Sequence, residues 1–122
     1  MNFCHVNSQS LLPHFFEFQS FFSANSYDII ALSETWLKPH VPDVLVHLDG
    51  YQFFRHDRLD RGGGGIGCYV RNGLSLKILA TSPASYCGQP EYFLVSLTSL
   101  GMRETRSHLP PPQTWALCSL SG

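Results

Sequence analysis

A compact apolar segment, Tyr27–Ser33, constrains the fold more than any other part of the sequence. Its longest uninterrupted apolar run, Ile29–Leu32, is far shorter than the roughly 20 residues that a membrane span needs. An apolar run of this kind directly after a helical pattern is typical of a strand that is buried on both faces of a sheet. We therefore expect an α/β protein whose sheet contains this strand.

The pattern before this segment predicts one amphipathic helix on the outer face of the sheet. Ser10 ahead of Pro13 suits a helix start, where proline is tolerated, and Asn25-Ser26 ends the pattern. Helical spacing predicts a mostly apolar face made of Leu12, Phe15, Phe16, Gln19 and Phe22.

Several strands joined by short turns are expected on either side of this unit. Alternating or compact apolar runs predict them at Met1–Asn7, Tyr51–Phe54, Ile66–Arg71 and Glu91–Thr98. Asn72-Gly73 is the signature of a type I′ hairpin, in which both central residues need a positive φ, and Leu74, Leu76 and Ile78 alternate after it. The order of elements indicates a sheet that is partly antiparallel.

The glycines Gly62, Gly64 and Gly67 satisfy the pattern G-x-G-x-x-G, but a dinucleotide site is not expected here. Such a loop follows a strand and opens a helix, whereas these glycines follow a charged loop and enter the strand-like Tyr69-Val70. We interpret them as a turn with close backbone packing at a strand entrance.

Composition and charge exclude some function classes. The formal net charge of -1 gives no global basic field for nucleic acid, so any such function rests on local residues. Neither a secretory signal nor a membrane span is expected. No zinc-ligand spacing joins the four cysteines, which we interpret as reduced thiols in an intracellular protein: Cys4, Cys68, Cys87 and Cys118.

Asn7 and Glu34 are the most informative polar residues, because each lies where a strand is expected to end. Binding groups in α/β sheets gather outside the carboxyl ends of strands. Mg²⁺ prefers oxygen ligands and is commonly held by one or two carboxylates together with a substrate phosphate. Taken alone, however, Glu34 is as compatible with a solvated loop residue, and Asn7 with a turn or cap residue.

A resemblance to a known family gives these residues more weight. His5–Leu11 is similar to the strand and active-site asparagine that open the endonuclease/exonuclease/phosphatase fold, and Asp28–Leu37 closely resembles the segment whose glutamate binds the metal. Other segments look, in order and spacing, like the apurinic-like endonuclease of non-LTR (LINE-type) retrotransposons: Gly50-Tyr51, Arg55–Arg58, Arg61–Asn72 and Pro90–Val95.

The resemblance runs from about residue 1 to residue 100 and implies roughly the first half of a DNase I-like two-sheet α/β sandwich. It implies that Glu34 is a Mg²⁺ ligand and that Asn7 positions the phosphate or the catalytic groups. Arg58 and Arg61 are candidates for contact with the DNA backbone, although a solvated charged loop is equally consistent. The implied partner is DNA, in the nucleus or cytoplasm, without a small-molecule cofactor.

The sequence also departs from the family pattern. The later half of the family supplies a tyrosine, a G-D-x-N segment and a terminal S-D-H, and none of these is present here. Ser107-His108 lacks the intervening aspartate. We therefore expect residues 1–100 to be a truncated, inactive endonuclease domain, and residues 101–122 an unstructured tail because of their charges and Pro110–Pro112.

Two other functions stay open. The sheet or the phenylalanine-rich helix of a non-catalytic binding module would pair with a partner protein through exposed apolar surface. A phosphoesterase of the same fold would act on a lipid or nucleotide. The retrotransposon-like segment Arg55–Asn72 favours DNA, and metal-dependent nicking of plasmid DNA would distinguish the enzyme from the module.

Overall fold

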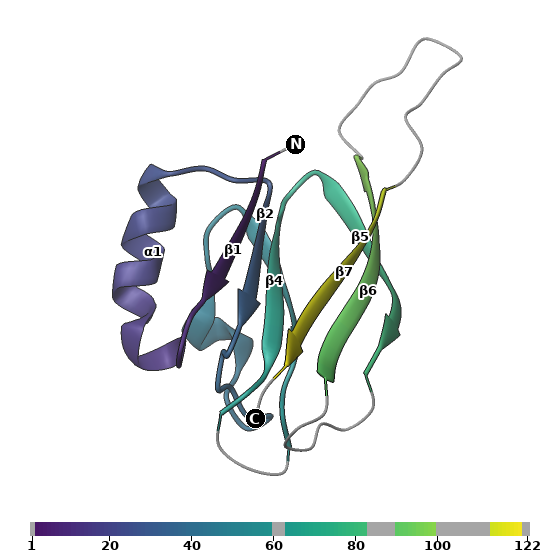
Figure 1. The fold of residues 1–122 in the computed structure, drawn as a ribbon. Helices are drawn as coiled ribbons and strands as arrows, with labels where there is room; N and C mark the ends of the chain where they lie inside the picture. Colours follow the sequence, from purple (N-terminus) through teal and green to yellow (C-terminus); the bar gives the residue numbers. More distant parts are fainter. Residues whose placement is uncertain (1, 60–62, 83–89, 100–112, 121–122) are drawn as a thin grey trace, which may run out of the picture.

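The computed structural model describes residues 2–59, 63–82, 90–99 and 113–120 (Figure 1). These ranges contain one α-helix, α1 (Phe15–Ala24), preceded by a 3-10 turn at Leu12–His14, and a second 3-10 turn at Asp43–Val46. The strands are β1 (Phe3–Asn7), β2 (Ile29–Ser33), β3 (Tyr51–His56), β4 (Ile66–Arg71), β5 (Leu74–Thr81), β6 (Pro90–Ser99) and β7 (Gln113–Leu120).

The strands form two sheets. The first has the order β1-β2-β4-β3, with β1 parallel to β2 and the other neighbours antiparallel. The second has the order β5-β6-β7 and is antiparallel throughout. Figure 1 shows α1 on one side of the first sheet and the second sheet on the other. The α/β class, the two sheets and the helix on an outer face are thus as expected from the sequence.

Strand β2 lies between two hydrophobic layers, and all five of its residues are buried. Ile30 and Leu32 pack with Tyr69 in the layer under α1, whereas Ile29 and Ala31 pack with Val95 between the two sheets. Each large apolar side chain buried in this way stabilises the fold by about 1.5–3 kcal/mol. The prediction that this strand is buried on both faces is confirmed.

The apolar face of α1 differs from the predicted one. Leu11 and Phe22 are buried and Phe15 and Phe18 pack beside them, while Phe16, which was expected on this face, is 77% exposed. The predicted Leu12 is also exposed. The side chains that face the sheet follow the regular helical spacing i, i+4, i+7 and i+11, but they start from Leu11, one residue before the predicted Leu12.

The prediction of a type I′ hairpin at Asn72-Gly73 is wrong. Gly73 has a φ of +99°, but Asn72 has no positive φ, and β4 and β5 on either side belong to different sheets. Strand β4 already pairs with β2 and β3, so neither of its edges is open to β5. The backbone N–H of Asn72 instead donates to the carbonyl of Gly50, and the dipeptide is a corner between the sheets.

Part of the tail that was expected to be unstructured forms a strand. Gln113–Leu120 is β7, which pairs antiparallel with β6 in a register that joins Val95 to Trp115. The segment itself contains neither glycine nor proline, and β6 offers it an open edge beyond β5. Residues 101–112 and 121–122 lie outside the described part of the chain.

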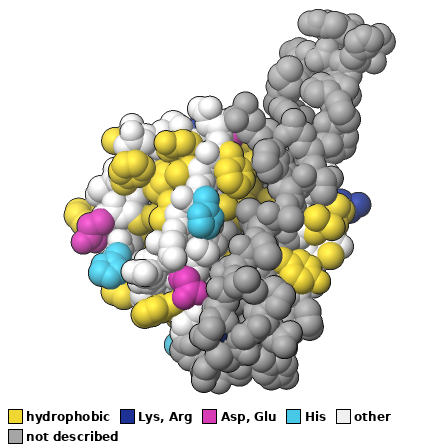
Figure 2. Space-filling view, viewed as in Figure 1, with side chains coloured by type: hydrophobic (Ala, Val, Ile, Leu, Met, Phe, Trp, Pro, Cys, Tyr) yellow, Lys and Arg dark blue, Asp and Glu magenta, His cyan; other side chains and the backbone are white. Residues whose placement is uncertain are grey.

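Hydrophobic side chains are also exposed on the α1 side of the molecule, as Figure 2 shows. Among the large ones are Phe16 and Phe21 of α1 and Phe3 of β1. Within the described residues, no helix has the length and hydropathy that crossing a membrane requires.

Candidate functional site at the strand ends

The carboxyl ends of β1 and β2 lie side by side because the two strands are parallel and in register. Asn7 pairs with Ser33, which places Glu34 one residue beyond the partner of Asn7. Ser8 joins the ends of the two strands. Its N–H donates to the carbonyl of Ser33 at 3.0 Å, and its hydroxyl donates to the carbonyls of Ser33 and Glu34. The structure therefore brings the two predicted site segments to one end of the sheet.

The backbone at this end is strained. Glu34 and Trp36 have φ angles of +54° and +58°, and Gln9 and Ser10 opposite them have +43° and +80°. A residue with a side chain in this left-handed region costs of order 1–3 kcal/mol, and such residues cluster at functional sites. Hydrogen bonds hold the conformation, because the N–H of Ser10 donates to the carbonyl of Glu34 at 2.9 Å.

The glycine-rich segment forms the other side of this end. The carbonyl of Gly65 accepts from the N–H of Thr35 at 3.2 Å, and that of Gly64 accepts from the N–H of Trp36 at 2.8 Å. A Cβ at Gly64 would collide with the guanidinium of Arg58, and one at Gly65 with the hydroxyl of Thr35. Close backbone packing at the entrance of β4 therefore explains these glycines, as the sequence predicted; Gly62 lies outside the described residues.

The carboxylate of Glu34 is only partly satisfied. Its Oε1 accepts a long hydrogen bond of 3.4 Å from the indole Nε1 of Trp36. Its Oε2 is buried and has no hydrogen-bond partner among the described residues. A buried polar atom without a partner costs about 1–3 kcal/mol, and more when it is charged. A cation beside Oε2 would remove that cost.

The residues at this end fit a magnesium ion. Mg²⁺ keeps several waters and needs only one or two protein carboxylates, and Glu34 offers one. Asn7, with an exposed amide side chain, ends the neighbouring strand. In the described part of the chain no three His, Cys, Asp or Glu side chains gather as a metal cluster. A single carboxylate of this kind is compatible with a hard cation whose other ligands are water.

Arg58 is placed differently from the expected solvated loop residue. It is only 2% exposed, and its guanidinium lies against Gly64 beneath the glycine-rich segment. Its carbonyl accepts from the Nζ of Lys38 at 2.8 Å. This position packs Arg58 against the glycine-rich segment and is not that of a solvated loop residue. Arg61 lies outside the described residues.

Arg55 fixes the loop that follows the site. Its guanidinium donates to the carbonyls of Lys38 and Val41 and to the carboxylates of Asp43 and Asp57, at 2.7–2.8 Å for the shortest bond to each. Burial alone would lower the pKa of Arg55, but the hydrogen bonds and charges of Asp57 and Asp43 outweigh it and raise that pKa above its ordinary value. The chain after Glu34 is thus anchored to β3.

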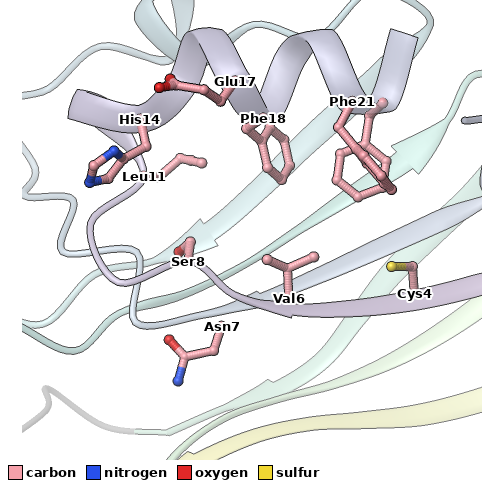
Figure 3. A pocket seen from close by; sticks show the side chains of 10 residues that line it. Cys4, Val6, Asn7, Ser8, Leu11, His14, Glu17, Phe18 and Phe21 are labelled. Carbon is pink, nitrogen blue, oxygen red and sulfur yellow. The ribbon is translucent and has the colours of Figure 1, made fainter. Parts of the chain in front are cut away.

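A separate groove of about 420 Å³ lies between α1 and β1 (Figure 3). The side chains of Cys4 and Val6 from β1 and of Ser8 directly after it point into the groove, whereas that of Asn7 points to the opposite side of the strand. The groove thus belongs to the apolar face under α1.

Cys4 and Cys68 are free thiols, and burial raises the pKa of both, that of Cys68 to about 12.

The sequence predicted Asn7 and Glu34 as site residues, and it did not single out Ser8 and Trp36, which lie at the same end of the sheet. Ser8 directly follows the candidate asparagine, and its hydroxyl was a signal that the two strand ends are joined. Trp36 stands two residues after the candidate ligand, and a tryptophan in a polar loop was a signal of an exposed aromatic group. The left-handed backbone that connects these residues has no signature in the sequence.

Comparison with known proteins supports the fold. No protein-family model matches the chain, and no curated protein does. A solved structure, the AP endonuclease LMAP from Leishmania major, matches with a TM-score of 0.59 at 21% identity, over 79% of this chain and 34% of that one. This chain thus spans about a third of the length of that protein. Its architecture is therefore a partial DNase I-like fold, shared with part of an AP endonuclease.

Proposed function

We propose that residues 1–100 are part of a magnesium-dependent DNA endonuclease domain of the kind carried by non-LTR retrotransposons. The observation that carries this proposal is the buried, unpartnered Oε2 of Glu34 at the carboxyl end of β2. The resemblance of His5–Leu11 and Asp28–Leu37 to the family segments supports it, and so does the partial DNase I-like fold.

In this proposal the two strand ends divide the work of binding. Glu34 holds the cation through its carboxylate, and the amide of Asn7 orients the phosphate from the parallel strand beside it. A bound magnesium ion polarises a phosphoryl oxygen and lowers the pKa of a bound water. The hydrogen bonds from Ser8 and Ser10 keep Glu34 in its strained conformation, so that the carboxylate is in position before the ligand arrives.

We further propose that these 122 residues bind the cation without cutting DNA. The acid and asparagine of G-D-x-N and the histidine of S-D-H, which in the family activate the attacking water and complete the site, have no counterpart in the sequence. Proton transfer and charge stabilisation each contribute typically about 10² to 10⁴ in rate. Without both, turnover falls below detection.

The test measures binding and cleavage separately. Isothermal titration with MgCl₂ is expected to show one site in the chain, lost in Glu34→Gln and kept in Glu17→Gln, whose carboxylate is exposed on α1. Supercoiled plasmid is expected to stay intact with magnesium. Equal binding by Glu34→Gln contradicts the ligand assignment, and nicking that Glu34→Ala abolishes contradicts the inactive state.

A binding module is the second candidate, favoured by the exposed Phe16 and Phe21 of α1. In that case a protein partner would cover the α1 side, and magnesium would not affect the association. Loss of association in Phe16→Ala without any effect of Glu34→Gln would support the module. A phosphoesterase acting on a lipid or nucleotide is less well supported, because the retrotransposon-like segment Arg55–Asn72 favours DNA.

A further inference from the structure

Trp36 is held out from the protein at the candidate site. Its side chain is 46% exposed, although the residues on either side of it, Thr35 and Leu37, are each 1% exposed. Two buried neighbours therefore anchor the chain and leave the indole in solvent. The exposed indole thus stands next to Glu34 with its ring accessible to a ligand.

Hydrogen bonds from the backbone and from the side chain hold Trp36 in place. Its backbone has a φ of +58°, and its N–H donates to the carbonyl of Gly64 at 2.8 Å. Its indole Nε1 reaches Oε1 of Glu34, and a Cβ at Gly63 would lie 3.7 Å from the same nitrogen. The backbone of Trp36 is thus fixed by the glycine-rich segment, and its indole lies against the candidate ligand Glu34.

We propose that Trp36 is a stacking platform for one unpaired nucleobase of a DNA strand whose phosphate contacts the cation held by Glu34. This proposal rests on the proposed function and names its substrate class. Every base has a face that stacks on an indole, whereas in a duplex those faces are covered by neighbouring bases. The substrate is therefore DNA with an unpaired or extruded base next to the bound phosphate.

Among the described residues at this end of the sheet, the arginine guanidinium groups are turned to the protein itself, which favours stacking over phosphate contacts. The chain has a net charge of -1, Arg58 is buried, and Arg55 is occupied by Asp43 and Asp57. Binding through stacking releases few counterions, so affinity should depend only weakly on salt. A plot of log affinity against log salt concentration is expected to have a slope between about -0.7 and about -1.4, the values for one and two phosphates of a single strand.

The first arm of the test reports on the cation alone. The sequence holds two tryptophans, Trp36 and Trp115, so Trp115→Phe leaves Trp36 as the sole tryptophan. Because its Nε1 contacts Glu34, MgCl₂ without DNA is expected to shift the emission of Trp36, and Glu34→Gln is expected to remove the shift. This arm tests the proposed function and is independent of stacking.

The second arm reports on the base. A 12-nucleotide single strand is expected to quench Trp36, and the blunt duplex of the same sequence is not. By anisotropy with the labelled single strand, Trp36→Ala should weaken binding on the order of tenfold, and Trp36→Phe should recover part of the loss. Phe16→Ala, which removes an exposed ring on α1, is the matched control and should bind as the parent does. Circular dichroism verifies that each variant is folded.

The outcomes separate the two proposals. A magnesium shift without quenching by the single strand overturns the platform and leaves the metal site. Quenching by the single strand without a shift by magnesium overturns the metal site and leaves the platform. Equal quenching by strand and duplex, or unchanged affinity in both Trp36 variants, also overturns the platform. Loss of affinity that Trp36→Phe partly restores, together with unchanged affinity in Phe16→Ala, supports it.

Discussion

The two ends of the first sheet turn the chain in different ways. At the end where β1, β2 and β3 finish, non-glycine residues take left-handed conformations, among them Glu34 and Trp36. At the opposite end the left-handed positions are Gly50 and Gly73, and a Cβ at either would meet open space. At the second end the chain therefore turns through glycines, which adopt a positive φ without strain. The strain at the first end is therefore not required for turning the chain, and it agrees with the function proposed for that end.

The two ends also differ in how far their arginine side chains, Arg55 and Arg71, are exposed. Arg55 at the candidate site end has a side chain 15% exposed and reaches across to the loop 38–43. Arg71 at the opposite end is 38% exposed and binds Asp28, Ser26 and the carbonyl of Tyr27. The network of Arg55 joins β3 to the loop 38–43 that follows the site, and the network of Arg71 joins β4 to the residues before β2.

The largest expected contrast is between two glycine substitutions. Gly65→Ala combines a φ of +88° with a collision against the buried Thr35, so it should lower the free energy of unfolding by about 3 kcal/mol. Gly73→Ala, with a φ of +99° and open space, should cost about 1 kcal/mol. Urea denaturation followed by circular dichroism measures both. Equal losses would contradict the difference in packing between the two ends.

The second contrast concerns the two arginines. Arg55→Ala should destabilise the chain by about 2–3 kcal/mol, because it leaves two carbonyls and the largely buried Asp57 without their partner. Arg71→Ala should cost about 1 kcal/mol, since its network is more exposed. Thermal unfolding of the two variants side by side measures the difference, and a larger loss for Arg71→Ala would reverse the comparison.

Between the two ends, Cys68 in the middle of β4 provides a reference that neither turn affects. Burial raises its pKa from about 9 in the unfolded chain to about 12. The unfolded state therefore loses the thiol proton first, and stability that is complete below pH 9 should fall as pH rises toward 12, by at most about 1.4 kcal/mol per pH unit. Urea midpoints at pH 8.5 and pH 10 measure this slope. The slope should flatten in Cys68→Ala and persist in Cys4→Ala, whose thiol is less buried.

The smallest expected effect has the opposite sign. Glu34→Gly relieves a φ of +54° and removes a buried carboxylate oxygen that has no partner, so it should stabilise the chain by up to about 1 kcal/mol while abolishing magnesium binding. Asn72→Gly at the opposite end is the control. Asn72 has no positive φ, so the change should only cost the about 0.5–1 kcal/mol of added chain entropy. Destabilisation by Glu34→Gly would contradict the interpretation of this end as strained for function.

Patterns that depend on nearest neighbours were predictable from the sequence. The run Ile29–Leu32 identified the doubly buried strand, and the strand ends located Asn7 and Glu34. What depended on distant partners was not predictable. Asn72-Gly73 reads as a hairpin until β4 is known to have both neighbours, and Gln113–Leu120 reads as tail until β6 is known to have an open edge. Likewise, a charged loop around Arg58 gave no sign that its guanidinium lies under Gly64.

The ladder that joins Ser8–Leu11, Glu34–Trp36 and Gly64-Gly65 has a consequence for folding. These three segments are far apart in the sequence, and closing both intervening loops costs chain entropy before any of the bonds forms. A partly folded intermediate with α1 docked on β1 and β2 alone would lack the segment Gly64-Gly65, whose carbonyls hold Thr35 and Trp36. The geometry around Glu34 would then arise only in the last cooperative step, and cation affinity would report completed folding more sharply than helix content does.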